Sequence, residues 1–349
     1  APATPTDSNN AANSVVEGAA NGTAVGITAS ATDVNGGTVT YSLTDDAGGR
    51  FAIDATTGVV TVADGTLLDF ETATSHSITV QASDGTATSS QTFTINVTNV
   101  APGTPTDSDN DANSVVEGAT NGTAVSITAS ATDINGGSIT YSLTDDAGGR
   151  FAIDATTGVV TVADGTLLDF ETATSHSITV QASDGTDTST QTFTINVTNA
   201  APATPTDSNS AANSIVEGAA NGTAVGITAS ATDINGGTVT YSLTDDAGGR
   251  FAIDATTGVV TVADGTLLDF ETATSHTITV QASDGVDTST QTFTINVTNA
   301  APATPTDSNN AANSVVEGAA NGTAVGITAS ATDINGGTVT YSLTDDAGG

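Results

Sequence analysis

The stretch GTLLDFETATSHSITVQASDG, residues 65–85, contains the two features that decide the fold and its chemistry. Apolar and polar residues alternate over residues 76–82, which is typical of a β-strand with one buried face. Before that strand, Asp69 and Glu71 stand two residues apart, directly behind an apolar pair. The stretch returns unchanged 100 residues later and with one change after a further 100 residues. The strand and the acidic pair therefore belong to one repeated unit.

The chain of 349 residues follows this period of 100 residues almost throughout. A period of this length is too long for a solenoid unit and is the size of a small domain. We therefore expect each copy to fold around its own core. The expected domains are residues 1–100, 101–200 and 201–300, followed by residues 301–349 as the truncated N-terminal half of a fourth repeat.

Seven segments of one repeat have strand patterns, and residues that favour turns separate them. Seven short strands in about 100 residues predict an all-β, immunoglobulin-like fold, with tandem Greek-key β-sandwich domains in a linear array. Residues 96–114, which contain Pro102 and Pro105, are expected to form an extended connector. The predicted strands are residues 14–18 (a short edge strand), 24–31, 38–43, 51–54, 58–62 (a short central strand), 76–82 and 92–97.

The composition is strongly acidic, with 39 Asp and Glu against 3 Lys and Arg and a net charge of -36. Nucleic acid is excluded as a partner because phosphate contacts need basic residues. The chain has no Cys, so no disulfide can stabilise it, and no long apolar run, so we expect no membrane insertion in this segment. Self-repulsion of this size would be relieved by bound divalent cations.

The carboxylates of each repeat stand at strand ends. Loops of a Greek-key sandwich gather at its two ends. By strand count, Glu17, Asp69 and Glu71 fall at the end that leads to the next repeat, whereas Asp33 and Asp84 fall at the opposite end. Successive repeats would then meet with carboxylates on both sides, an arrangement that favours Ca²⁺ with 6–8 oxygen ligands.

The repeat resembles a cadherin domain, in the bacterial cadherin-like form found in large surface adhesins. The residues that carry the resemblance are Glu17, ATDVN (residues 31–35), FAIDATTGVVTV (51–62), LDFE (68–71) and HSITVQASD (76–84). The resemblance implies Ca²⁺ between successive domains, with neighbouring repeats of the same chain as partners. The chain has no Trp, so adhesion by exchange of a Trp-anchored strand is not expected.

The resemblance also implies a ligand set for each junction. The linker before each Ala-Pro pair is shorter and poorer in Asp than the linker of the family. The Asp of the PTDS segment is therefore a predicted replacement for a missing ligand, and in the second repeat Asp109 and Asp111 are further predicted replacements. The first set is Glu17, Asp69, Glu71, Asn99, Asp107, Asp133, Asn135 and Asp184. The second is Glu117, Asp169, Glu171, Asn199, Asp207, Asp233, Asn235 and Asp284, and the third is Glu217, Asp269, Glu271, Asn299, Asp307, Asp333 and Asn335.

Other side chains have simpler interpretations. Asp69 and Glu71 could form a glycosidase-like acid pair, but the chain offers no aromatic platform for a sugar. Arg50 is expected to pair with Asp45 or Asp46, and His76 to pack inside the sandwich.

These observations predict a structural protein without enzymatic activity. We expect a calcium-rigidified extracellular spacer or filament segment of a bacterial surface adhesin, which holds an adhesive domain away from the cell. Two alternatives remain open. The repeats could themselves bind a partner, such as polysaccharide or identical chains in a fibre, or they could be accessory modules of a secreted hydrolase.

Overall fold

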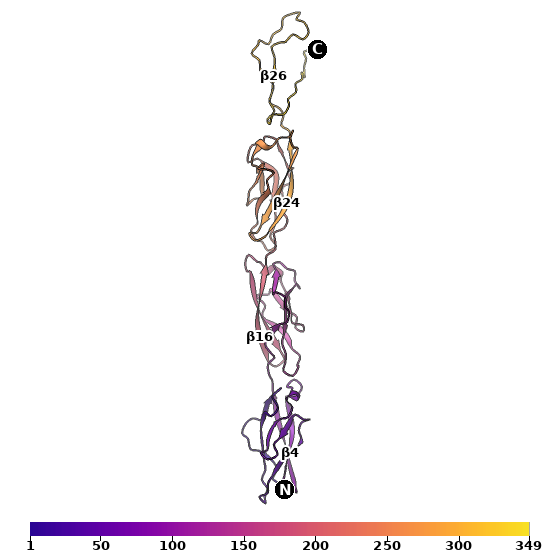
Figure 1. Ribbon diagram of the computed structural model, residues 1–349, viewed down its shortest axis with the longest axis vertical. Coiled ribbons are helices and arrows are strands. Elements are labelled where there is room, and N and C mark those ends of the chain that lie inside the picture. Colours follow the sequence, from indigo (N-terminus) through magenta and orange to yellow (C-terminus); the bar gives the residue numbers. More distant parts are fainter. Residues whose placement is uncertain (349) are drawn as a thin grey trace. The chain divides into compact units, whose positions relative to one another are not determined.

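The computed structural model describes residues 1–348 and separates into two compact units, residues 1–198 and residues from 199 onward. The regular elements of the described residues are β-strands and three short 3-10 turns, which confirms the all-β prediction. Figure 1 shows strands in two layers in each of the first three repeats. The described residues contain no helix long and apolar enough to cross a bilayer.

The first repeat is a sandwich of two four-stranded sheets, in the orders β1-β3-β6-β5 and β2-β8-β7-β4. Neighbouring strands are antiparallel except β2, which lies parallel to β8 at a sheet edge. The strands are β1 (Thr6–Asp7), β2 (Ser14–Val16), β3 (Ala24–Ser30), β4 (Thr40–Asp45), β5 (Phe51–Ile53), β6 (Val59–Val62), β7 (Ser75–Ser83) and β8 (Thr88–Thr98), with a 3-10 turn at Gly65–Leu67.

The second and third repeats have the same topology. The second contains β9 (Thr106–Asp107), β10 (Ser114–Val116), β11 (Ala124–Ser130), β12 (Thr140–Asp145), β13 (Phe151–Ile153), β14 (Val159–Val162), β15 (Ser175–Ser183) and β16 (Thr188–Thr198). The third contains β17 (Thr206–Asp207), β18 (Ser214–Val216), β19 (Ala224–Ser230), β20 (Thr240–Asp245), β21 (Phe251–Ile253), β22 (Val259–Val262), β23 (Ser275–Ser283) and β24 (Thr288–Thr298).

The core follows from the alternation in the sequence. Ile78, Val80 and Ala82 of β7 are fully buried, and the residues between them face outward or lie half-buried. Burial of apolar side chains is the main favourable term in folding. Each of the first three repeats has its own cluster of buried apolar residues, so each contains a separate core.

The predicted connector is shorter than the sequence suggested. Thr106–Asp107 forms β9, which pairs with β11 of the second repeat, and the same arrangement recurs in the other repeats. Pro102 and Pro105 are buried rather than exposed in a linker. The prediction that all of residues 96–114 are extended connector is therefore wrong, and each sandwich has eight strands instead of seven.

Arg50 does not make the predicted ion pair with Asp45 or Asp46. Its Nε donates to the carbonyl oxygen of Leu67 at 2.9 Å and its Nη1 to that of Ala47 at 2.7 Å. The guanidinium therefore holds two loops together through their backbones.

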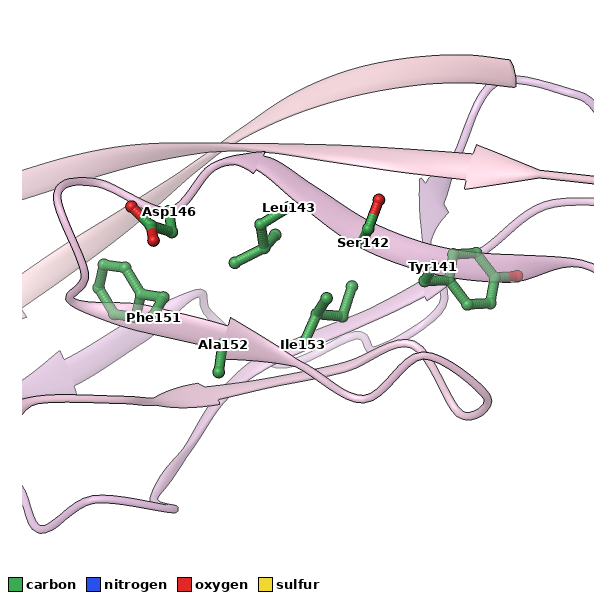
Figure 2. A pocket seen from close by; sticks show the side chains of 7 residues that line it. All are labelled: Tyr141, Ser142, Leu143, Asp146, Phe151, Ala152 and Ile153. Carbon is green, nitrogen blue, oxygen red and sulfur yellow. The ribbon is translucent and has the colours of Figure 1, made fainter. Parts of the chain in front are cut away.

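The two edge strands β12 and β13 face each other at one side of the second sandwich and border a pocket of about 270 Å³. Figure 2 shows Leu143 and Ile153 between the two strands. The backbone N–H of Phe151 donates to the carbonyl of Asp146 at 3.2 Å and ties the strands at one end. Asp146 is the only carboxylate in the lining, so the acidic site lies elsewhere.

Residues 301–348 contain only β25 (Thr306–Asp307) and β26 (Ala329–Ser330), which pair with each other. Val325 is 43% exposed, whereas its equivalent Val25 is fully buried. This part of the chain has no counterpart of the strands that cover Val25 in the first repeat.

Candidate metal centre

Glu17 anchors one end of the first sandwich. It follows β2 and is buried. Its Oε2 accepts a hydrogen bond from the backbone N–H of Phe70 at 3.0 Å, and its Oε1 accepts one from that of Val100 at 2.7 Å. Two such bonds compensate much of the cost of burying a carboxylate. Glu17 therefore fixes both the LDFE segment and the start of the linker.

The LDFE segment presents its two carboxylates beside Glu17. The carboxylate of Asp69 accepts hydrogen bonds from the backbone N–H of Thr72 at 2.8 Å and from its hydroxyl at 2.7 Å. The bond from the Thr72 hydroxyl is the largest reason that the pKa of Asp69 is lowered. Carboxylate oxygens of Glu17, Asp69 and Glu71 all lie within 4.8 Å of one another.

A second acidic group joins the first repeat to the second. Carboxylate oxygens of Glu71, Asp133 and Asp184 lie within 4.8 Å of one another, and all three residues belong to the first unit. The side-chain amide of Asn135 donates to the carbonyl oxygen of Leu68 across the same junction. The structure thus brings together Glu71, Asp133 and Asp184, three of the side chains that the sequence predicted on either side of the joint.

The charge of this cluster is not balanced by protein cations. Burial raises the pKa of Glu71, and the charges of Glu17, Asp133 and Asp184 raise it further. The described residues contain three Arg and no Lys, and Arg50 and Arg150 are engaged with backbone carbonyls elsewhere in their repeats. Like charges this close favour a bound cation.

Two buried acceptors indicate where a cation fits. Asp133 is only 8% exposed, and its Oδ2 is buried without a hydrogen bond; the same is true of the Oδ1 of Asn99. A buried acceptor without a donor is costly and needs an explanation such as an ion. The donors are carboxylate and amide oxygens without sulfur or imidazole, which suits Ca²⁺ rather than Zn²⁺ or Cu²⁺.

Asn99 contacts a carboxylate that was not predicted. Its Nδ2 donates to Oδ2 of Asp184 at 3.0 Å and also to Oδ2 of Asp187 at 2.8 Å. The one signal for Asp187 in the sequence is that this position differs among the repeats, with Ala87 in the first repeat and Asp287 in the third. Nothing in the strand pattern indicated that this side chain reaches the linker of the preceding repeat.

The second unit contains an equivalent cluster where the third repeat meets the fourth. Oxygens of Glu217, Asp269 and Glu271 lie within 4.8 Å of one another, and the amide of Asn335 donates to the carbonyl of Leu268. Partial desolvation and then the charges of Glu217, Asp333 and Asp269 raise the pKa of Glu271. Asn299 is exposed and lies in the linker that follows β24.

The second predicted set is divided between the units. Glu117, Asp169 and Glu171 lie in the first unit, where Glu117 accepts a hydrogen bond from the backbone N–H of Phe170 at 2.9 Å. Within the second unit, the Nδ2 of Asn199 donates to Asp284 at 3.0 Å and to Asp287 at 2.9 Å. The other residues of the set in the second unit are Asp207, Asp233 and Asn235.

Asp107 has another environment. Its Oδ1 accepts hydrogen bonds from the backbone N–H groups of Asp109 at 3.0 Å and Thr128 at 3.1 Å. Asp207 and Asp307 make the same contacts with their own repeats. Within residues 1–348, none of these three joins an acidic cluster that could hold a metal, and their part as replacement ligands stays a prediction.

The fold and the site together define a class of protein, namely tandem β-sandwich repeats with carboxylates gathered where repeats meet. The cadherin domain model matches residues 12–98, 111–198 and 212–298, so the chain belongs to the cadherin family. The resemblance drawn from the sequence is confirmed at the level of the cadherin domain.

Among known proteins, the chain is similar to human protocadherin Fat 4, with 35% identity over 139 residues, which are 38% of this chain and 3% of that protein. Human protocadherin Fat 1 is also 35% identical, over 156 residues, 42% of this chain and 3% of that protein. The chain thus spans only a small part of these relatives. A crystal structure of mouse cadherin-23 EC22-24 aligns with 85% of this chain and 99% of its own, at 25% identity and a TM-score of 0.36.

Proposed function

We propose that this chain is a calcium-rigidified extracellular spacer or filament segment of a cell-surface adhesin of the bacterial kind, which holds an adhesive domain away from the cell. The observation that supports it most directly is the cluster of Glu71, Asp133 and Asp184, in which two successive repeats supply carboxylates to one place. Cadherin domains in general bind Ca²⁺, and the acidic groups of this chain suit that role.

The residues that would hold Ca²⁺ at the first junction are Glu17, Asp69, Glu71, Asn99, Asp133 and Asp184. A bound ion would offset the like charges that now face one another and would link side chains of both repeats. Glu17 positions the linker and the LDFE segment, and Asn135 adds a direct contact between the repeats. Bending at the joint would then require breaking ion–oxygen contacts.

Several features support a mechanical role over a catalytic one. The repeats are nearly identical, and tandem copies of a catalytic site would gain little. Glu17 and Asp69 are held by backbone N–H groups and by the hydroxyl of Thr72, which suits a fixed binding role. The family consists of adhesion and structural domains.

Thermal unfolding of the full chain tests the calcium proposal. The unfolding temperature is measured with Ca²⁺, with Mg²⁺ and with excess chelator. Ligand binding to the native state stabilises it by RT ln(1 + [L]/Kd), about 2.7 kcal/mol per site at 100 times Kd. Relative to the chain in excess chelator, we expect the unfolding temperature to increase clearly with Ca²⁺ and to increase less with Mg²⁺. An unfolding temperature that is the same in all three solutions would contradict the proposal.

A further inference from the structure

The side chain of Asp187 reaches the linker that precedes its own repeat. Its Oδ2 lies 2.8 Å from Nδ2 of Asn99, the same nitrogen that contacts Oδ2 of Asp184 at 3.0 Å. Two carboxylates from one turn are therefore held side by side at the junction. Asp184 in turn lies within 4.8 Å of oxygens of Glu71 and Asp133. Asp187 is thus adjacent to the acidic cluster, although it is exposed and was absent from the predicted ligand set.

The side chain of Asp187 is not needed for the turn that carries it. In the second repeat, Oδ1 of Asp184 accepts hydrogen bonds from the backbone N–H groups of Thr186 and Asp187, both at 2.7 Å. In the first repeat, Oδ1 of Asp84 accepts the same two bonds, from the backbone N–H groups of Thr86 at 2.8 Å and Ala87 at 2.7 Å. Ala87 is the residue equivalent to Asp187. The turn forms equally with Ala, so the carboxylate of Asp187 serves another purpose.

Buried acceptors in Asn99 and in the adjoining acidic cluster indicate what that purpose is. Oδ2 of Asp133, in a side chain only 8% exposed, is buried without a hydrogen bond, and so is Oδ1 of Asn99. The second unit repeats the observation independently. There Nδ2 of Asn199 bridges Asp284 and Asp287, while Oδ2 of Asp233 and Oδ1 of Asn199 are buried without partners. Asp33 of the first repeat also has a buried oxygen without a partner, so this acceptor is common to the three repeats, whereas the additional carboxylate is present in the second and third repeats only.

We propose that Asp187 and Asp287 are additional calcium ligands, which supply to the second and third repeats an oxygen that the shortened linker lacks. The inference rests on the proposed function, because it assigns further ligands to the same junctions. The hydrogen bond from Asn99 to Asp187 leaves Oδ1 of Asn99 and Oδ2 of Asp133 without partners, so it does not explain these two orphan oxygens. More carboxylates at a calcium site raise its affinity. A repeat end carrying Ala87 should therefore bind Ca²⁺ more weakly than one carrying Asp187.

The test compares three full-length chains by equilibrium dialysis against Ca²⁺. They are the natural chain, the variant Asp187→Asn with Asp287→Asn, and a control with Asp145→Asn and Asp245→Asn. The control has the same change of charge, at turn residues whose carboxylates accept hydrogen bonds from the backbone N–H of Ala147 and Ala247. We expect the first variant to bind Ca²⁺ about tenfold more weakly at two of its sites. The control should bind Ca²⁺ with the affinity of the natural chain.

A second measurement separates a ligand from a structural acceptor. Loss of a ligand lowers calcium affinity, and it leaves the unfolding temperature in chelator unchanged or higher because like charges are removed. Loss of a structural hydrogen bond lowers that temperature and leaves calcium affinity unchanged, a result that would overturn the inference. If the natural chain binds Ca²⁺ and the variant binds it equally well, the inference fails and the proposed function stands. If the natural chain binds none, both fail.

Discussion

Glu17 and Glu71 are two glutamates of one cluster in opposite situations. Glu17 is buried, but both of its oxygens accept backbone hydrogen bonds. Glu71 is exposed, and partial desolvation together with the charges of Glu17, Asp133 and Asp184 raises its pKa. Glu17 therefore holds the LDFE segment and the start of the linker without a cation, whereas Glu71 is repelled by its neighbours unless a cation is present.

This difference predicts opposite effects of one substitution. Glu71→Gln with Glu271→Gln should raise the unfolding temperature in chelator, because it removes like charge, and should weaken calcium binding at those junctions about tenfold. Calorimetry with and without Ca²⁺ measures both effects. Asp45→Asn with Asp245→Asn is the control, since these turn residues lie outside the acidic clusters of the described chain. A variant less stable in both solutions would show that Glu71 has a structural role instead.

The backbone of Ser126 is strained in the second repeat. It has a φ of 59°, whereas Gly26 and Gly226 hold the same position with positive φ in the other repeats. A Cβ at Gly26 would overlap the carbonyl oxygen of Ala12. In the second repeat the hydroxyl of Ser114 donates to the carbonyl of Ala112. In the first repeat the backbone N–H of Ser14 donates to the carbonyl of Ala12 instead. The loop has changed its contacts where a side chain is present.

Ser126→Gly should therefore stabilise the second repeat by about 1 kcal/mol. Amide hydrogen exchange of β11 in the full chain measures the effect locally. The reciprocal change Gly226→Ser should destabilise the third repeat by a similar amount. Slower exchange in the serine variant, or faster exchange in the glycine variant, would refute this explanation.

At the scale of the strand, β7 carries a titratable group against the core. The ring of His76 lies 6.3 Å from that of Phe51, and its Nε2 is buried without a hydrogen bond. Burial, followed by the charge of Arg50, lowers the pKa of His76 below 6.5. His176 and His276 have the same environment in their repeats.

A lowered pKa gives the stability a definite dependence on pH. The unfolded chain takes up the proton first, so the stabilisation is complete above pH 6.5 and is lost as the pH falls through the folded-state pKa. We expect the unfolding temperature in chelator to decrease below pH 6.5. Replacement of all three histidines by Phe should remove the part of that decrease that occurs above about pH 5, where the carboxylates with lowered pKa values are still ionised. If the pH profile of the variant matched that of the natural chain, other groups would be responsible.

The strands show how far the sequence predicts this fold. Alternation located β3, β4, β7 and β8 because their buried faces follow a period of two. β1 was missed because two residues directly after a proline are too short to show a period. The partner of Arg50 was predicted wrongly because backbone carbonyls are invisible in a residue pattern. Asp187 was missed because its contact with Asn99 spans 88 residues.

At the scale of the whole chain, the net charge of -36 and the repeated acidic clusters have a common consequence. At the first junction, the charges of Asp133 and Asp184 from the second repeat raise the pKa of Glu71 from the first repeat, so these carboxylates repel one another without a cation. With Ca²⁺, the same carboxylates would hold the joint in one arrangement.

Small-angle X-ray scattering of the full chain tests this central claim most directly. Scattering is recorded with Ca²⁺ and with excess chelator at the same ionic strength, so that simple screening is equal. We predict a larger radius of gyration and a narrower distribution of distances with Ca²⁺, because the joints stiffen. Identical scattering in the two solutions would contradict the account, and the acidic clusters would then contribute only to solubility.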